Sequence, residues 1–258
     1  DRIHHVLTRH EQRATHMAAG YARSSGKVGV ALATSGPGAA NMVTGLATAM
    51  MDSVPIVCIT GQVPRPAIGS DAFQEMDISG AVIPVTKHSY LVMDIKDLAK
   101  TIKEAFVIAR SGRPGPVLVD IPKDLQAEEF DFIYPEEPIM LPGDNPIKND
   151  IDVKSLEEAA KLIANAERPV ILAGHGILLS GASKEVIELS EKGDIPLSWT
   201  LLGSGAVPAS HDLNMGMMGM HGEFAANNAI QKADLLIACG MRFAVSYTHL
   251  TLPTNREV

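Results

Sequence analysis

Apolar positions along the chain form short continuous runs rather than a strict alternation of apolar and polar residues. Continuous runs of this kind are typical of strands buried on both faces, as in parallel sheets. They predict strands over Val28–Thr34, Pro55–Thr60, Pro116–Ile121, Pro169–Ala173, Ile195–Thr200 and Leu235–Cys239. Longer stretches between these runs have helical patterns, which predict helices over Glu11–Ser25, Ala39–Met51, Leu98–Arg110, Ser155–Ala166, Lys184–Lys192 and Glu223–Lys232.

Strands and helices therefore alternate, which indicates right-handed βαβ units and an α/β fold. Residues 125–150 break this alternation, because acidic residues and prolines concentrate there. Such a composition disfavours a packed element and predicts a linker. We therefore expect two doubly wound parallel-sheet domains, residues 1–124 and residues 151–243, joined by that linker.

Composition places the chain among globular proteins. It has 258 residues, of which 46% are hydrophobic and 20% charged, which is enough apolar material for a core. The formal net charge is −8 and aromatic residues make up 4%. Nucleic acids and anionic membranes are therefore poor partners.

The two cysteines, Cys58 and Cys239, lie in apolar, strand-like runs. This predicts buried free thiols in a reducing compartment such as the cytoplasm. The uncharged stretch 28–51 could be taken for a membrane span, but a Ser-Gly-Pro-Gly turn interrupts it. The histidines are scattered, and no metal site is predicted among them.

Glu11 is the first candidate for chemistry. The sequence Thr8-Arg9-His10-Glu11 fits a capping box, in which the Glu side chain bonds back to the amide of the cap residue. Local rules favour that structural interpretation. The functional alternative is a carboxylate at a helix start that exchanges a proton with a ligand nitrogen, with its pKa raised by burial.

Two further segments follow predicted strands of the first domain. Glycines in the first let the backbone approach a ligand, although tight strand-to-helix packing would explain them equally well. The second begins where open α/β sheets bind ligands and continues as a long segment to about Ser89. These segments begin with Thr34-Ser35-Gly36-Pro37-Gly38-Ala39-Ala40-Asn41 and with Gly61-Gln62-Val63-Pro64.

In the second domain, Gly174-His175-Gly176 follows a predicted strand, and glycines and methionines recur between residues 203 and 222. Glycines at strand ends suit a dinucleotide, and Met side chains suit a flat apolar ring. Ordinary turn and core usage would explain each residue singly. The residues alone thus indicate a two-domain α/β protein with a nucleotide-like ligand.

The order of the motifs carries a resemblance to a known family. The motifs are His10-Glu11-Gln12, His16 to Arg23, Thr34 to Gly38, Thr60 to Pro64, Gly69, Asp71 to Glu75 and Ser111 to Asp124. They resemble thiamine-diphosphate-dependent enzymes. Together with Thr86-Lys87-His88 and Gly216 to Gly222, they are similar to the large catalytic subunits of acetolactate synthases, over residues 1 to about 243.

This resemblance implies decarboxylation of pyruvate and its carboligation to a second 2-keto acid, in branched-chain amino acid biosynthesis. The family glutamate that matches Glu11 bonds N1′ of the cofactor's aminopyrimidine, which reverses the structural interpretation of Glu11. Gln62 and Lys87 are implied in catalysis, and Phe73, Gln74 and Lys87 in the substrate channel. The Ser-Gly-Pro-Gly turn and the residues after it would add cofactor contacts through Gly36, Pro37, Gly38 and Asn41.

The resemblance also implies a largely structural FAD. Its contacts would be Arg113, Gly174, His175, Gly176, Thr200, Leu201, Met220, His221, Gly240 and Arg242. Mg²⁺ and the diphosphate of thiamine diphosphate are implied to bind in a third domain, which these residues do not include. The implied partners are further copies in a homodimer or homotetramer, and binding of a small regulatory subunit stays open.

The two ends depart from the family pattern. The family continues with Asp-Asp-Arg after Phe243, whereas residues 244–258 here show no periodicity and are predicted to be a non-native tail. The chain starts at Asp1 without Met, so an incomplete N-terminal domain is predicted, and the fragment alone is expected to be inactive. The alternatives are another thiamine-diphosphate enzyme, such as pyruvate oxidase or glyoxylate carboligase, and a non-catalytic nucleotide-binding module. Glyoxylate carboligase lacks the glutamate, so Glu11 argues against it.

Overall fold

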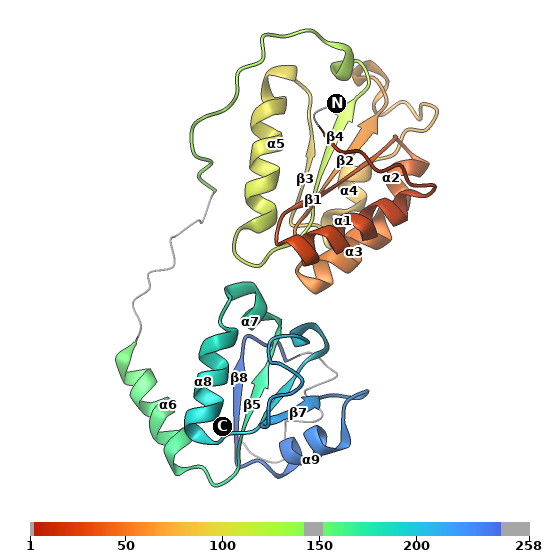
Figure 1. Ribbon diagram of the computed structural model, residues 1–258. Coiled ribbons are helices and arrows are strands. Elements are labelled where there is room, and N and C mark those ends of the chain that lie inside the picture. The colour runs from red at the N-terminus through yellow and green to blue at the C-terminus, as the bar shows by residue number, and fades with distance from the viewer. Residues whose placement is uncertain (1–2, 142–151, 244–258) are drawn as a thin grey trace. The chain divides into compact units, whose positions relative to one another are not determined.

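The computed structural model describes residues 3–141 and 152–243. The chain divides into two compact units, Asp1–Pro146 and Ile147–Val258, and their boundary falls within the predicted linker. Each unit is a parallel sheet with helices packed against it (Figure 1). The predicted α/β class with two parallel sheets is confirmed. The predicted tail, residues 244–258, lies outside the described residues.

The sheet of the first unit has the order β1-β2-β4-β3, and all its neighbouring strands are parallel. Every residue of β4 is buried, as expected for a continuous apolar run. The prediction of burial on both faces is wrong for β1, which lies at the edge and leaves Val30 and Leu32 45% and 58% exposed. The strands are β1 (Gly29–Ala33), β2 (Ile56–Gln62), β3 (His88–Leu91) and β4 (Val117–Pro122).

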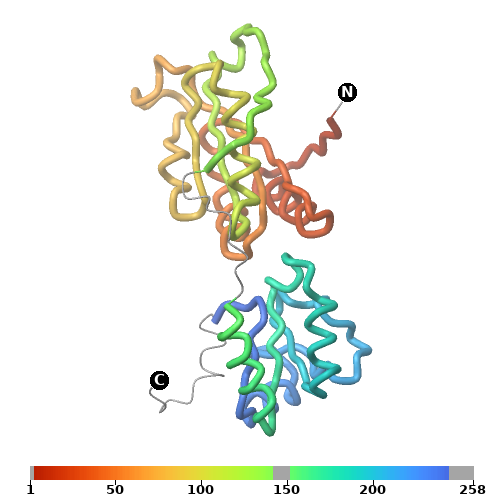
Figure 2. The backbone as a smooth tube through the Cα atoms, turned by 90° about the vertical axis from the view of Figure 1, so that its left-hand side faces the viewer, coloured from red at the N-terminus to blue at the C-terminus, as the bar shows by residue number. Residues whose placement is uncertain are grey.

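Helices cover both faces of this sheet (Figure 1), and Figure 2 views the unit from the side of α5. One core cluster joins α1 and α3 to the sheet through residues such as Ala18, Leu46 and Cys58. A second cluster, with Ala105 and Val119, joins α5 to the opposite face. The helices are α1 (Glu11–Ser25), α2 (Pro37–Asn41), α3 (Val43–Asp52), α4 (Ile78–Ala81) and α5 (Ile95–Arg110), with 3₁₀ turns η1 (Arg65–Ala67), η2 (Ile83–Val85) and η3 (Leu125–Ala127).

Three predicted segments differ in detail from the structure. The stretch 39–51 is divided into α2 and α3, which meet at Met42. The long segment after Gly61 contains α4 and β3 rather than loop alone. Leu125, where the predicted linker begins, is buried in the α5-side core. Lys103 of α5 donates hydrogen bonds to the carbonyls of Glu136 and Glu137, so the chain stays against the first unit beyond Leu125.

The second unit repeats the architecture with the parallel order β7-β6-β5-β8. Ile171 and Leu197 pack with α7 and α8 on one face, whereas Leu172 packs with Ile230 of α9 in a separate cluster. The strands are β5 (Pro169–Ala173), β6 (Leu197–Trp199), β7 (Asn214–Met217) and β8 (Leu235–Cys239). The helices are α6 (Val153–Asn165), α7 (His175–Ser180), α8 (Ser183–Gly193) and α9 (Phe224–Lys232), with a 3₁₀ turn η4 (Leu201–Gly203).

The uncharged stretch 28–51 forms β1, a turn and two helices. Across residues 3–141 and 152–243, no helix is both long and apolar enough to cross a membrane. The break predicted at the Ser-Gly-Pro-Gly turn is therefore confirmed, because the turn separates β1 from α2.

Both cysteines are free, and Cys58 is fully buried whereas Cys239 is partly exposed. Burial raises the pKa of the Cys58 thiol to about 12. Because the thiolate is the reactive form, Cys58 in the native protein should react with a disulfide reagent at pH 8 only as fast as the first unit opens. Stopped-flow thiol titration in native buffer and in denaturant checks this. Rapid modification of Cys58 under native conditions would contradict its burial.

Candidate functional site

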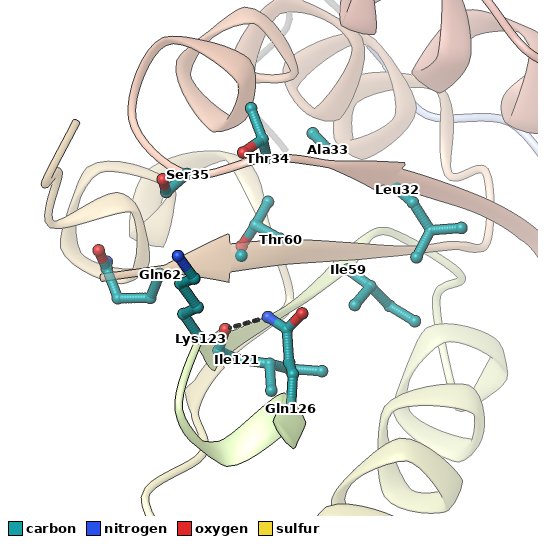
Figure 3. Close-up of a pocket in the computed structure, with 11 residues that line it drawn as sticks. Leu32, Ala33, Thr34, Ser35, Ile59, Thr60, Gln62, Ile121, Lys123 and Gln126 are labelled. Atoms are coloured by element: carbon teal, nitrogen blue, oxygen red, sulfur yellow. Dashed lines mark hydrogen bonds between the residues drawn. The ribbon is translucent and has the colours of Figure 1, made fainter. Parts of the chain in front are cut away.

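The carboxyl ends of β1, β2 and β4 border a cleft of about 470 Å³ (Figure 3). Open parallel sheets bind ligands at this edge, because strand ends and helix N-termini converge there. Within the cleft wall, the Gln126 side-chain amide donates a 2.7 Å hydrogen bond to the Ile121 carbonyl. The lining residues are Leu32, Ala33, Thr34, Ser35, Ile59, Thr60, Gly61, Gln62, Ile121, Lys123 and Gln126.

Glu11 lies in the first turn of α1, but the capping interpretation is wrong. The N-cap is His10, whose ring Nδ1 accepts a 3.1 Å hydrogen bond from the Gln12 amide, so Thr8 is outside the helix start. The Glu11 carboxylate instead accepts a 3.0 Å hydrogen bond from the Asn41 side-chain amide. This bond lowers the pKa of Glu11, contrary to the expected rise through burial.

The glycine-rich turn lies directly beside Glu11. Gly36 has a φ of 59°, and a Cβ there would lie 2.6 Å from the Gln74 carbonyl oxygen. A Cβ on Gly38 would lie 3.5 Å from Glu11 Oε1 and 2.7 Å from Thr34 Cγ2. The turn thus brings Glu11, Asn41 and residue 74 to one place, and glycine keeps the approach to the Glu11 carboxylate open.

The segment after η1 folds back over this turn. The Glu75 carboxylate accepts hydrogen bonds from the amides of Gly69 and Ala72, which closes residues 69–75 into a small loop. Gln74 has a φ of 60°, a left-handed conformation that is strained for a non-glycine residue. Phe73, at the tip, is 89% exposed. The structure therefore brings the predicted channel residues Phe73 and Gln74 to the edge that carries Glu11.

Gln62 lies at the end of β2 in a buried polar cluster with Thr60 and Asp120. Thr60 donates a 2.7 Å hydrogen bond to Asp120 Oδ1, and Gln62 Nε2 donates one of 2.9 Å to Asp120 Oδ2. Sequence reasoning missed Asp120 as a functional residue. A signal was available, because Asp120 is the one charged residue of a strand that is otherwise apolar and buried throughout.

Burial raises the pKa of Asp120 to about 6, against the lowering effect of its bonds from Thr60 and Gln62. The nearby Asp77 raises it further. Its pKa is thus higher in the folded state than the 3.8 of an unperturbed aspartate. The folded state then binds more protons between pH 4 and 6, so this group's contribution to stability falls as pH rises through that window.

Asp120→Asn removes this titration. As pH rises from 4 to 7, the wild-type protein should lose about 2 kcal/mol of unfolding free energy that the variant does not lose. Urea unfolding of the first unit at both pH values measures the difference. The exposed Asp131→Asn variant is the control and should follow the wild-type protein. Equal pH dependence in Asp120→Asn and wild type would show that Asp120 has an ordinary pKa.

Lys87 and Arg113 lie at the opposite end of the strands from the cleft, where β3 and β4 begin. Lys87 precedes β3 and donates to the carbonyl and hydroxyl oxygens of Ser111, at the end of α5. Arg113 donates to the Ser53 hydroxyl and to the Met50 carbonyl, at the end of α3. Because the strands are parallel, these residues are at the amino edge, whereas Gln62 is at the carboxyl edge. Within one copy of the chain, the structure does not bring Lys87 together with Gln62 and Phe73.

The predicted FAD residues of the second unit all follow its strands, at the carboxyl edge of that sheet. The glycines there meet backbone closely, since a Cβ on Gly174 would lie 2.4 Å from the Gly240 carbonyl oxygen and one on Gly176 would lie 2.7 Å from Gly240 Cα. Packing between the ends of β5 and β8 therefore requires glycine at these positions with or without a ligand. The set is Gly174, His175 and Gly176 after β5, Thr200 and Leu201 after β6, Met220 and His221 after β7, and Gly240 and Arg242 after β8.

Comparisons with known proteins identify the family that the chain resembles. The N-terminal TPP binding domain of thiamine pyrophosphate enzymes matches residues 1–81, and the central domain of these enzymes matches residues 156–257. An acetolactate synthase of Arthrospira platensis is 51% identical over 246 residues, covering 93% of this chain and 42% of the relative. The acetolactate synthase large subunit of Corynebacterium glutamicum is 50% identical over 242 residues, covering 94% and 38%. The chain spans about two fifths of the length of these relatives.

Proposed function

The chain belongs to the thiamine pyrophosphate enzymes, and from that premise we propose that it forms the pyrimidine-binding and central domains of an acetolactate synthase large subunit. The relatives named acetolactate synthase support this activity. The observation that carries the proposal is the Glu11 carboxylate, held by Asn41 beside Gly38 at the carboxyl edge of the first sheet.

These residues suit the aminopyrimidine of thiamine diphosphate. The lowered pKa keeps Glu11 ionised at neutral pH, so its carboxylate accepts a hydrogen bond from a ring nitrogen that carries a proton. Asn41 fixes the direction of the carboxylate, and Gly38 leaves room for an approaching ring. The bound cofactor supplies the carbon nucleophile and the electron sink for decarboxylation of pyruvate and carboligation to a second 2-keto acid.

The remaining channel residues support an assembly of several copies. Phe73 and Gln74 lie at the edge with Glu11, whereas Lys87 lies at the opposite edge of the same sheet. A channel lined by all three therefore needs a second copy to complete it. We propose a homodimer as the smallest active unit, with a homotetramer and a small regulatory subunit as further levels of assembly.

The second unit is proposed to bind FAD in a structural role. Polar and glycine backbone groups at the carboxyl ends of its strands fit a dinucleotide, and the exposed Met220 and Leu201 could cover a flat ring. Arg113, a residue of the first unit, is proposed as a further FAD contact. Mg²⁺ and the diphosphate group are proposed to bind in the part of the longer relatives that this chain does not span.

The proposal is tested by assaying the complete subunit that carries this sequence, with pyruvate, thiamine diphosphate, Mg²⁺ and FAD. We expect one acetolactate and one carbon dioxide for every two pyruvates consumed, without oxygen consumption. Oxygen uptake coupled to pyruvate loss would identify an oxidase instead. Absence of any pyruvate turnover in a folded, cofactor-loaded protein would contradict the proposal.

A further inference from the structure

The side-chain amide of Gln62 has one defined orientation. Its Nε2 lies 2.7 Å from the Met76 carbonyl oxygen and 2.9 Å from Asp120 Oδ2, while its Oε1 accepts a 2.9 Å hydrogen bond from the Val63 amide. A carbonyl oxygen and a carboxylate only accept hydrogen bonds, and a backbone amide only donates. Nε2 must therefore face Met76 and Asp120, and both of its N–H groups are used inside the protein.

This orientation limits what Gln62 can offer to a ligand. Gln62 is 7% exposed and lines the cleft. Its remaining hydrogen-bonding capacity is the second lone pair of Oε1, because both donors are occupied. Toward a ligand in the cleft, the Gln62 side chain can therefore act only as a hydrogen-bond acceptor. It suits a hydroxyl or an N–H group, and it does not suit a carbonyl or carboxylate oxygen.

Asp120 maintains the orientation at a cost to the fold. Its side chain is 1% exposed, and burial of an ionised carboxylate is unfavourable even with two hydrogen bonds. Its two oxygens nevertheless accept from Thr60 and from Gln62, which an apolar residue could not do. The same Gln62 amide also bonds Met76, the residue that follows the loop 69–75 with Phe73 and Gln74.

We propose that Asp120 is a positioning residue that holds Nε2 of Gln62 inward, so that Gln62 presents Oε1 alone to a ligand hydroxyl or N–H group in the cleft. The identity of that ligand rests on the proposed function. In carboligation, a two-carbon nucleophile bonds to the keto carbon of the second 2-keto acid, and the keto oxygen becomes a hydroxyl by taking up the proton that the nucleophile's own hydroxyl gives up as its carbonyl forms. Gln62 can pair with that hydroxyl and not with the keto oxygen, so its contact forms as the reaction proceeds, where it lowers the barrier rather than tightening substrate binding.

The orientation is tested without any enzymatic assay by NMR of the ¹⁵N-labelled 258-residue chain at pH 7. The Gln62 side-chain NH₂ signal, identified by its absence in Gln62→Ala, should exchange slowly with solvent in the wild-type protein. In Asp120→Ala, exchange should be faster by about tenfold or more, which corresponds to the loss of one hydrogen bond of roughly 1.4 kcal/mol. In Asp120→Asn, the Asn oxygen can still accept from Gln62, so slow exchange should be kept.

Leu118→Ala is the matched control, because Leu118 is a fully buried residue of the same strand that packs in the core. It should lower the unfolding free energy while leaving exchange at Gln62 slow. Wild-type protection of Gln62 in Asp120→Ala, or equally fast exchange in Leu118→Ala, would overturn the positioning role. Loss of protection in Asp120→Asn would overturn it as well.

A kinetic measurement on the complete subunit extends the test. Asp120→Ala should lower kcat, corrected for the folded fraction, by about tenfold or more with little change in KM, and Asp120→Asn should restore it to within about threefold. Unchanged kcat in Asp120→Ala would overturn the role. If the subunit forms no acetolactate but the NMR result holds, the proposed function fails and the positioning stands. If acetolactate forms and the NMR result fails, the positioning alone is wrong.

Discussion

Glu11→Gln in the complete subunit is expected to lower the rate of acetolactate formation by about 10²–10⁴-fold, the range of a lost proton-transfer group. The substituted amide keeps the size of the side chain, and its oxygen can still accept from Asn41. It lacks the negative charge that favours a protonated ring nitrogen. The loss should therefore appear in kcat, while the melting temperature changes little.

Glu185→Gln provides the control for Glu11→Gln. Glu185 is also in the first turn of a helix, α8, and it is exposed to solvent. The same chemical change there should leave acetolactate formation at the wild-type rate. Comparable turnover by Glu11→Gln and Glu185→Gln would remove Glu11 from the proposed reaction.

Gly29→Ala is expected to lower the unfolding free energy of the first unit by about 2–3 kcal/mol, within the usual range for overpacking. A Cβ at Gly29 would lie 2.1 Å from the Ala18 carbonyl oxygen and 2.6 Å from its carbonyl carbon. These are backbone atoms of α1, so relief requires a shift of the whole helix against β1. The midpoint of urea unfolding measures the effect.

Gly20→Ala is the matched control on the same helix. A Cβ at Gly20 would meet nothing within 4 Å, and the residue is exposed. Alanine there should stabilise the unit by about 0.5–1 kcal/mol, because glycine is a poor helix former. If Gly29→Ala were also neutral or stabilising, the close approach of α1 to β1 would be wrong.

The sequence predicted best those elements that are defined by local patterns or by burial. The bounds of α1 agree residue for residue, because an acidic start and a left-handed Gly26 cap mark its ends. β4 agrees within one residue because its run is apolar and fully buried. β3 and β7 were missed, since both are short edge strands held by backbone pairing rather than by apolar side chains.

The candidate site was predictable only in part. Glu11 was found from its motif, but its partner Asn41 is 30 residues away, and the nearer Thr8 suggested a capping box instead. The role proposed for Asp120 depends on the parallel pairing of β2 with β4, which places Thr60 opposite it. Lys87 was grouped with Gln62 by resemblance, and the strand direction separates the two within one copy. In each case, the way in which segments distant in the sequence pack together decides which residues meet.

We propose that Glu11 activates thiamine diphosphate at the carboxyl ends of the strands of the first sheet. The most direct measurement is the rate at which the thiazolium C2 proton of thiamine diphosphate exchanges for deuterium in the complete subunit, followed by quenched-flow NMR. Exchange in the wild-type protein should be about a hundredfold or more faster than in Glu11→Gln. Equal exchange rates in the two proteins, with the cofactor bound in both, would contradict it.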